Sequence, residues 1–360
     1  MEFYNCDISD EAKRVVNEIL NSGYLNQGKL VRALEKDMMP EYIGVHYPLL
    51  TNSCTAALHI ALELSNVRGR EVILPGKTFI ATGMAVLMAG GKPVFCDVEI
   101  DTRNLSLETM KPLVNENTAA VIGVSYGGLS CSLELRKIKE TYKHLSIIED
   151  AAHAFGNIDE HTSYIDYRCY SFQAIKALSC GDGGMIASRM YNQHLKAKAM
   201  RWFGINKDKM TFDPNGKRRM QVESYGFKYN MNDLNAAILG GNLKDFHKRK
   251  SARYNVTQLL STYIDKQPIY KNNSFWLFGI LAKNSDDWIK RANAEGIPAR
   301  KMDSDISGHA VFGFNGILKN TRFIDENEIY FPCHHMLTFG DVGNISSFLK
   351  KIKESGDLIC

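Results

Sequence analysis

The sequence lacks the features that mark membrane, secreted and nucleic-acid-binding proteins. No apolar run approaches the roughly 18 residues that a membrane helix needs, and the N-terminus has neither the basic segment nor the apolar run of a signal peptide. The net charge is only +4, and the basic clusters at 216–219 and 244–253 are interrupted by other residue types, as on solvated helix faces or loops. We therefore expect a cytoplasmic protein that binds neither a membrane nor a nucleic acid.

The cysteines do not form a recognisable pattern either. All eight are scattered without C-x-x-C spacing, which favours reduced, mostly buried thiols over disulfides. One cluster, Cys333, His334 and His335, contains residue types that bind metals. Because adjacent residues on an extended chain point to opposite sides and no second pair has zinc-like spacing, the sequence predicts no metal site.

The size and order of the apolar segments predict an α/β fold. At 360 residues, of which 44% are hydrophobic, the chain is long enough for a large domain and a smaller one. From about residue 46, short apolar runs alternate with stretches that suit helices, which predicts a mainly parallel seven-stranded sheet sandwiched by helices. The expected strands are 46–53, 71–77, 92–98, 119–125, 146–150, 167–172 and 183–188.

The last third of the sequence has longer helical segments and fewer strands. It predicts a smaller α+β domain, and we expect the large domain at residues 1–240 and the small domain at 241–360.

Two glycine-containing segments resemble nucleotide-binding loops but do not fit them. Residues 23–30 match G-x-x-x-x-G-K, yet the Ser or Thr that would hold magnesium is missing and no strand precedes them. Residues 181–186 lack the third glycine of G-x-G-x-x-G and lead into a strand instead of a helix. Neither a P-loop nor a Rossmann dinucleotide site is therefore expected.

The expected strand at 46–53 passes directly into a helix, and this junction suits a phosphate group. In open α/β sheets, ligands bind beyond the carboxyl ends of the strands, and the unpaired amides of a first helical turn attract anions. Plain N-capping of the helix by Ser53 or Thr55 is the structural alternative.

Two further residues at strand ends carry ionisable groups. Asp150 ends the apolar run 146–150, and a buried acid there needs a cationic or hydrogen-bonding partner, which a protonated pyridine nitrogen would supply. A helix N-cap or a structural ion pair would also explain it. Lys176 follows the expected strand 167–172, and a lysine in an apolar setting can form Schiff bases, although most lysines are solvated. A phosphate site, an acid and a buried lysine together are what pyridoxal phosphate (PLP) requires.

With these residues in place, the sequence resembles the DegT/DnrJ/EryC1/StrS family of PLP-dependent sugar aminotransferases, which have the fold type I architecture. The resemblance extends over nearly the whole chain, from SGYLNQGKLVRALEKD near the start to FPCHHMLTFGDV near the end. It implies that Lys176 in SFQAIK binds the cofactor aldehyde and later moves a proton, and that Asp150 pairs with the pyridine nitrogen. It places His153 near the phenolic oxygen and Phe79 on the ring face.

The resemblance also assigns the phosphate ligands. Cys54 and Thr55 in NSCTAAL, with Ser171, would hold the phosphate, although Cys54 stands where many members have glycine. The segment 225–238 resembles the part of the family that reaches across a homodimer to the partner's phosphate. Either Lys228 or Asn230 would make that contact, and the choice between them stays open.

The implied reaction moves an amino group from an amino acid, usually L-glutamate in this family, to a nucleotide-linked keto sugar. Arg201 in RWFG and Arg300 in IPARK lie in segments that approach the substrate in the family, while surface arginines are the alternative. The motifs EDAAHA, SFQAIK and GFKYNMND resemble those of the family members that aminate C4 of the sugar more than those of the C3 enzymes, which implies a 4-keto-6-deoxy sugar in preference to a 3-keto sugar. Amino-sugar and surface-glycan biosynthesis would be the setting.

Two other functions were weighed against this one. Relatives that are PLP-dependent sugar dehydratases replace the Schiff-base lysine with histidine, so Lys176 argues against a dehydratase. A catalytically idle binding protein with this fold would have lost the lysine, the aspartate or the phosphate position, and the sequence retains all of them.

Overall fold

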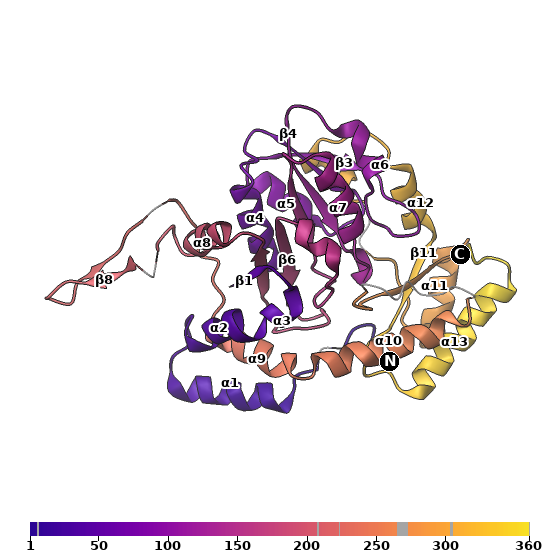
Figure 1. Ribbon diagram of the computed structural model, residues 1–360. Helices are drawn as coiled ribbons and strands as arrows, with labels where there is room; N and C mark the ends of the chain where they lie inside the picture. The colour runs from indigo at the N-terminus through magenta and orange to yellow at the C-terminus, as the bar shows by residue number, and fades with distance from the viewer. Residues whose placement is uncertain (6, 207–208, 223, 265–272, 303–304, 360) are drawn as a thin grey trace.

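A seven-stranded sheet forms the centre of the computed structural model, which describes residues 1–5, 7–206, 209–222, 224–264, 273–302 and 305–359 (Figure 1). The strand order is β1-β7-β6-β5-β4-β2-β3; β7 runs antiparallel to β1 and β6, and the other neighbours are parallel. This confirms the predicted fold, with the strands at β1 (Tyr47–Thr51), β2 (Glu71–Pro75), β3 (Lys92–Cys96), β4 (Thr118–Val124), β5 (Ser146–Asp150), β6 (Tyr167–Ser171) and β7 (Gly184–Ser188).

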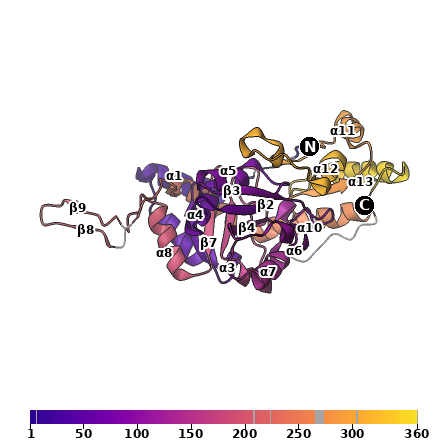
Figure 2. The same ribbon diagram turned by 90° about the horizontal axis from the view of Figure 1, so that it is seen from above.

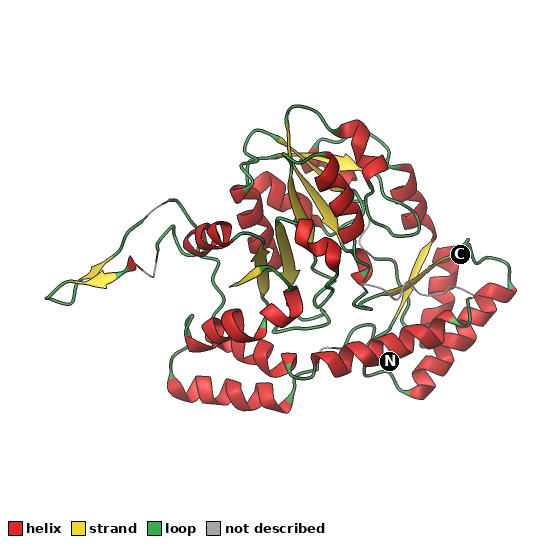
Figure 3. Cartoon of the chain, viewed as in Figure 1, coloured by secondary structure: helices red, strands yellow, loops and turns green. Residues whose placement is uncertain are grey.

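Helices cover both faces of this sheet, as Figure 3 shows. Successive residues of one strand enter different cores: Ile148 of β5 packs in the cluster that contains α4 and α5, whereas Ile147 packs in the cluster that contains α7. Burial on both faces explains why the strands read as continuous apolar runs instead of alternating ones. The helices of this part are α4 (Cys54–Leu64), α5 (Ile80–Met88), α6 (Leu107–Met110), α7 (Ser132–Thr141) and α8 (Tyr191–Met200).

The N-terminal helices α1 (Asp10–Ser22) and α2 (Lys29–Ala33) pack against α9 (Asp233–Leu243), while α3 (Pro40–Ile43) contacts β1. The Asp233 carboxylate accepts hydrogen bonds from the Gly28 N–H at 2.7 Å and the Val31 N–H at 3.2 Å, which satisfies amides at the start of α2. On α9, Gly241 faces α1 so closely that an added Cβ would lie 2.4 Å from the backbone of Ala12. The α1–α9 contact therefore requires a residue without a side chain at this position.

The C-terminal elements form a separate apolar core beside a two-stranded antiparallel sheet. Leu260, Ile280, Trp288, Ile329 and Phe348 are among its buried residues. The boundary expected between residues 240 and 241 stays a prediction. The elements are α10 (Phe246–Ser261), β10 (Phe278–Leu281), α11 (Ser285–Ala294), α12 (Lys319–Asn327), β11 (Glu328–Phe331) and α13 (Phe339–Glu354).

A hairpin of β8 (Thr211–Phe212) and β9 (Arg218–Arg219) extends away from the body of the molecule in both views (Figures 1 and 2). Its side chains are exposed, including Phe212 at 62%. The basic cluster 216–219, predicted as a solvated helix face or loop, lies in the turn and in β9 of this hairpin. Among the described residues, no helix is long and apolar enough to cross a bilayer. The six cysteines that the structure describes are all unpaired thiols, while Cys6 and Cys360 lie outside the described residues.

The close approach of α1 and α9 generates a stability prediction. Gly241→Ala should lower the free energy of unfolding by about 1–3 kcal/mol, because the new methyl group overlaps the Ala12 backbone and forces the helices apart. Gly240→Ala is the matched control, since its Cβ would contact only the Leu34 side chain, at 3.3 Å. Chemical denaturation should show Gly240→Ala as neutral or slightly stabilising; equal losses in both variants would contradict the prediction.

Candidate active site

The carboxyl ends of the strands open onto a cavity of about 770 Å³. Loops that follow β1, β2, β5 and β6 line it, as expected for ligand sites in open α/β sheets. Residues from the C-terminal part and Tyr4 of the N-terminal segment close its other side. Most of the predicted site residues line it together, namely Cys54, Thr55, Phe79, Asp150, His153, Ser171, Lys176 and Arg300.

Asp150 places a buried carboxylate at the base of this cavity. The residue is 5% exposed; its Oδ2 accepts a hydrogen bond from the Thr82 hydroxyl at 2.7 Å, and its Oδ1 accepts one from the Ala152 N–H at 3.1 Å. Burial raises the pKa of the Asp150 carboxyl, while these two hydrogen bonds and the positive charge of Lys176 act in the opposite direction. The carboxylate is therefore fixed in position, but the positive charge around it does not balance its own negative charge. A cationic ligand in the cavity would supply the missing charge.

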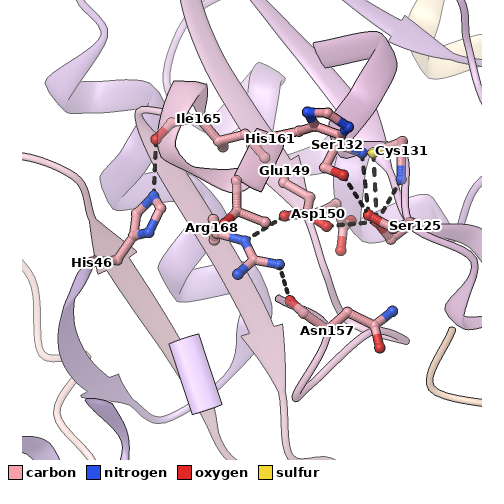
Figure 4. Close-up of polar contacts among 12 residues, drawn as sticks. His46, Ser125, Cys131, Ser132, Glu149, Asp150, Asn157, His161, Ile165 and Arg168 are labelled. Carbon is pink, nitrogen blue, oxygen red and sulfur yellow. Dashed lines mark hydrogen bonds and ion pairs between the residues drawn. The ribbon is translucent and has the colours of Figure 1, made fainter. Parts of the chain in front are cut away.

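A second buried carboxylate, Glu149, lies next to Asp150 on the opposite face of the sheet (Figure 4). Its Oε2 receives the Arg168 Nε at 2.6 Å and its Oε1 receives the Ser125 hydroxyl at 2.6 Å, while Arg168 also donates to the Asn157 carbonyl at 2.8 Å. Burial opposes the charged form of Arg168, yet the Glu149 carboxylate raises the pKa of Arg168 above its usual value. This ion pair neutralises Glu149, so Asp150 presents its charge to the cavity.

His153 is held beside Asp150 in one tautomer. The Gly127 N–H donates to His153 Nδ1 at 3.2 Å, so Nδ1 must be an acceptor and the proton of the neutral ring resides on Nε2. Burial and the nearby Lys176 charge lower the pKa of His153 well below its usual value. His153 is therefore a neutral hydrogen-bond donor at physiological pH.

Lys176 lies in the loop that connects β6 to β7. The Phe172 N–H donates to the Gly183 carbonyl and the Cys180 N–H donates to the Phe172 carbonyl, both at 2.9 Å, which closes this loop at its base. The Lys176 Nζ projects over the ring of Trp276, 4.1 Å from its centroid. The lysine is thus half-buried against an aromatic face and lines the same cavity as Asp150.

The start of α4 forms another wall of the cavity. Ser53 caps the helix by accepting a hydrogen bond from the Ala56 N–H at 3.1 Å. This confirms the N-cap that is the structural alternative to a phosphate site. The cap binds the Ala56 N–H, not the amides of Cys54 and Thr55, which lie in the first turn of α4 beside Ser171 in the cavity wall. Capping by Ser53 is therefore compatible with anion binding at this helix start. Burial and the charge of Asp150 raise the pKa of the Cys54 thiol well above its usual value, so the thiol stays neutral.

Of the glycines in the segment 181–184, Gly184 lies against this helix start. A Cβ on Gly184 would lie 2.2 Å from the Ser53 carbonyl carbon and 2.4 Å from the Cys54 nitrogen. Only glycine lets β7 lie directly against the first turn of α4.

Three predicted residues do not line the cavity. Arg201 is 2% exposed and forms a buried ion pair with Glu35 and a hydrogen bond of 2.6 Å to the Leu50 carbonyl. Lys228 Nζ lies 3.6 Å from the centroid of the Trp202 ring and donates to the Asn230 side chain at 3.0 Å. Their roles toward substrate or a partner subunit stay predictions.

The structure also brings two residues to the site that the sequence analysis missed. Thr82 ends the segment PGKTFIAT, which also contains Phe79. Its place in the first turn of α5, next to the ends of the strands, is a signal that could have identified it. Trp276 comes from the C-terminal part of the chain, where no local pattern points to Lys176. Only the folded chain shows that contact.

The chain matches the DegT/DnrJ/EryC1/StrS aminotransferase family over residues 6–350. The protein belongs to this family. Among its relatives, the spore coat polysaccharide biosynthesis protein SpsC of Bacillus subtilis is 34% identical over 251 residues, which cover 68% of this chain and 64% of SpsC. Membership confirms the predicted class, because the enzymes of this family are PLP-dependent sugar aminotransferases.

Solved structures agree in fold. Helicobacter pylori PseC, an aminotransferase involved in the biosynthesis of pseudoaminic acid, has a TM-score of 0.88 at 25% identity and covers 98% of this chain and 99% of its own. The PLP form of Spr1654 from Streptococcus pneumoniae has a TM-score of 0.87 at 20% identity and covers 99% of both chains. These superpositions confirm the fold type I architecture.

We predict that substitutions of the two adjacent carboxylates, Asp150 and Glu149, have opposite effects on stability. Burial raises the pKa of Asp150, so its charged form costs folding free energy above the ordinary aspartate pKa, and that cost falls as the pH drops through the raised value. Asp150→Asn should therefore raise the Tm of the PLP-free protein at neutral pH, with a smaller gain at low pH. The same change should reduce transamination at least about 100-fold, because in the role that the family resemblance implies for Asp150 it removes the charge that pairs with the pyridine nitrogen.

Glu149→Gln is the matched control on the same strand. It leaves Arg168 buried without its counter-ion and should destabilise the protein by about 3–5 kcal/mol. Thermal and chemical denaturation of the two variants test both effects. A fall in Tm for Asp150→Asn as large as that for Glu149→Gln would contradict the electrostatic description of the site.

Proposed function

We propose that this enzyme transfers an amino group from L-glutamate, by way of PLP, to a nucleotide-linked keto sugar, with a 4-keto-6-deoxy sugar as the favoured acceptor. One observation carries the proposal: a lysine amine, a buried carboxylate and an exposed helix start line a single cavity of about 770 Å³. These groups match the aldehyde, the ring nitrogen and the phosphate of PLP in chemical type. Amino-sugar and surface-glycan biosynthesis is the proposed setting.

The residues present fit PLP on electrostatic grounds. The pKa of Asp150 is raised because the buried carboxylate has too little positive charge around it. A protonated ring nitrogen that donates to the carboxylate would supply this charge. Thr82 and the Ala152 N–H fix the Asp150 carboxylate. Its side chain would therefore lose little conformational freedom when PLP binds. The first-turn amides of α4, with Thr55 and Ser171, would hold the phosphate.

His153 and Phe79 would fix the plane of the ring. Since the Gly127 N–H holds His153 Nδ1, the Nε2–H is the ring's available donor and would bond the phenolic oxygen. Phe79 is 53% exposed at the mouth of the cavity, where its side chain would cover one ring face. Both side chains orient the ring without carrying charge.

When bound, PLP supplies an aldehyde that reacts with an amine and a ring that accepts electrons. Lys176 would tether the aldehyde, and its released amine would then take the proton from the donor amino acid and return it on the adjacent carbon. Its half-buried position against Trp276 keeps the amine inside the cavity for this step.

The mouth of the cavity carries positive groups that suit an anionic substrate. Arg300 and Lys301 line it from the C-terminal part, and the Arg300 guanidinium lies 3.8 Å from the centroid of the Phe3 ring. We propose that Arg300 binds the carboxylate of glutamate or the diphosphate of the sugar nucleotide. Arg201, in its buried ion pair with Glu35, would act on substrate only indirectly.

A homodimer with shared active sites is part of the proposal. Lys228 and Asn230 lie on the segment that follows the projecting hairpin. Lys228 is exposed and Asn230 is half-buried, and we propose that one of them reaches the partner's phosphate. Exposed apolar side chains cluster along the same stretch, with Phe212 and Val222 at 62% and Tyr225 at 59%. Apolar groups gathered on a surface favour a protein partner.

The role of Lys176 is directly testable. Lys176→Ala should still bind PLP, but its absorbance spectrum should be that of the free aldehyde and its transamination should fall by at least about 10⁴-fold, since one residue serves both as tether and as proton carrier. Lys290→Ala, which removes a lysine that is 78% exposed, is the control and should behave as wild type. Retained turnover in Lys176→Ala would contradict the proposal.

The acceptor can be identified by supplying the PLP-loaded enzyme with L-glutamate and a panel of nucleotide-linked 3-keto and 4-keto sugars. Mass spectrometry of the products should show replacement of the keto oxygen by an amino group, fastest with the 4-keto-6-deoxy sugars. Faster reaction of the 3-keto sugars would reverse the proposed position. A product that has lost a hydroxyl group without gaining nitrogen would identify a dehydratase instead.

A further inference from the structure

Trp276 contacts two of the predicted site residues, Lys176 and His153, although no sequence pattern points to it. It is 3% exposed and enters the cavity wall from the C-terminal part of the chain, 101 residues after the peptide that it contacts. Its indole N–H donates to the Ile175 carbonyl at 2.9 Å, which fixes the backbone immediately before Lys176. The Lys176 Nζ lies 4.1 Å from the centroid of the Trp276 ring.

The same indole also supports His153. The two rings are stacked with centroids 3.8 Å apart and planes inclined by 24°, and Tyr4 stacks near Trp276 at 5.4 Å with an angle of 13°. Stacking at this distance leaves His153 little rotation about its side-chain bonds. One side chain therefore contacts the amine of Lys176, the backbone before it, and the imidazole next to Asp150.

The backbone around Trp276 is tied to the loop that orients His153. The Ser274 N–H donates to the Gly128 carbonyl at 3.0 Å and the Leu277 N–H donates to the Gly127 carbonyl at 3.1 Å. The Ser274 hydroxyl donates to the His153 carbonyl as well. Because Gly127 in turn holds the imidazole, the indole and the His153 ring belong to one fixed unit.

The face of an indole attracts an ammonium group because the ring carries negative charge above and below its plane. A lysine side chain is long and flexible, so an amine that is not bonded to a ligand needs a local contact to remain in one place. The Trp276 face supplies such a contact inside the cavity.

We propose that Trp276 is a positioning residue: it holds the Lys176 amine on its indole face whenever the lysine is not bonded to the cofactor, and it holds the His153 ring. The inference rests on the proposed function of Lys176. It implies that loss of the indole slows the proton transfer between donor amino acid and Lys176 far more than it weakens binding of PLP or of glutamate.

The test compares Trp276→Leu and Trp276→Phe with Trp288→Phe. Trp288 is a close match: it is 7% exposed, its indole N–H donates to Asp357 at 2.8 Å, and the Arg291 guanidinium lies 4.9 Å from its ring centroid, yet it packs in the C-terminal core. The measured quantities are the single-turnover rate constant with L-glutamate, the KM for glutamate, the Kd of PLP and the isotope effect with α-deuterated glutamate.

Trp276→Leu should lower the single-turnover rate constant by about tenfold or more and raise the isotope effect, while the KM and the Kd change less than about threefold. Trp276→Phe keeps an aromatic face and should recover part of the rate. Trp288→Phe should lower the Tm without slowing the reaction. Equal rate losses in Trp276→Leu and Trp288→Phe, or a Kd for PLP weakened as much as the rate, would overturn the inference.

A second measurement uses the PLP-free protein and needs no turnover. Trinitrophenylation of Lys176 by trinitrobenzenesulfonate, in which the neutral amine displaces sulfite from the aromatic ring, should be about 2- to 30-fold faster in Trp276→Leu, because the indole face no longer favours the ammonium form. Peptide mass analysis measures this rate. The exposed Lys290 serves as the internal reference. An unchanged labelling rate would contradict the contact. Failure of wild-type enzyme to react with glutamate would instead refute the proposed function and leave this measurement unaffected.

Discussion

The buried carboxylate of Asp150 is the interaction on which the rest of the site depends. A charged group that is 5% exposed must be compensated, and two hydrogen-bond donors fix this one without neutralising it. The fold contributes a second constraint, because the neighbouring Glu149 is already neutralised by Arg168 on the far face of the sheet. Of these two carboxylates, Asp150 is therefore the one that directs its negative charge into the cavity, where it meets an amine and a helix start.

Burial keeps the neighbouring Cys54 and His153 side chains neutral. The Cys54 thiol has a raised pKa and the His153 ring a lowered one, so neither competes with Lys176 for a role as base at neutral pH. This leaves Lys176 for the role that we propose, in which one amine reacts with carbonyls and moves protons. Trp276 completes the arrangement by giving the amine a defined position when it is released.

The parts of the molecule that could be predicted are those specified by short segments. Strands such as 146–150 are apolar over their whole length because both sheet faces are buried, and the residues that end them converge at one edge. Asp150 and Lys176 were recognised for that reason, and the family resemblance gave them roles. Trp276 could not be found this way, because its contact with Lys176 depends on how the C-terminal part packs against the sheet. Lys228 differs from both, because the role proposed for it depends on a second chain, which no single-chain pattern specifies.

The central claim, that Lys176 binds PLP through its amine, is tested most directly by borohydride reduction of the PLP-loaded enzyme followed by peptide mass mapping. The account predicts one reduced cofactor per chain on Lys176, in the segment that joins β6 to β7. Incubation with L-glutamate before reduction should remove this label, since the cofactor would then have left the lysine. Reduced cofactor on another lysine, or a label on Lys176 that glutamate does not affect, would contradict the account.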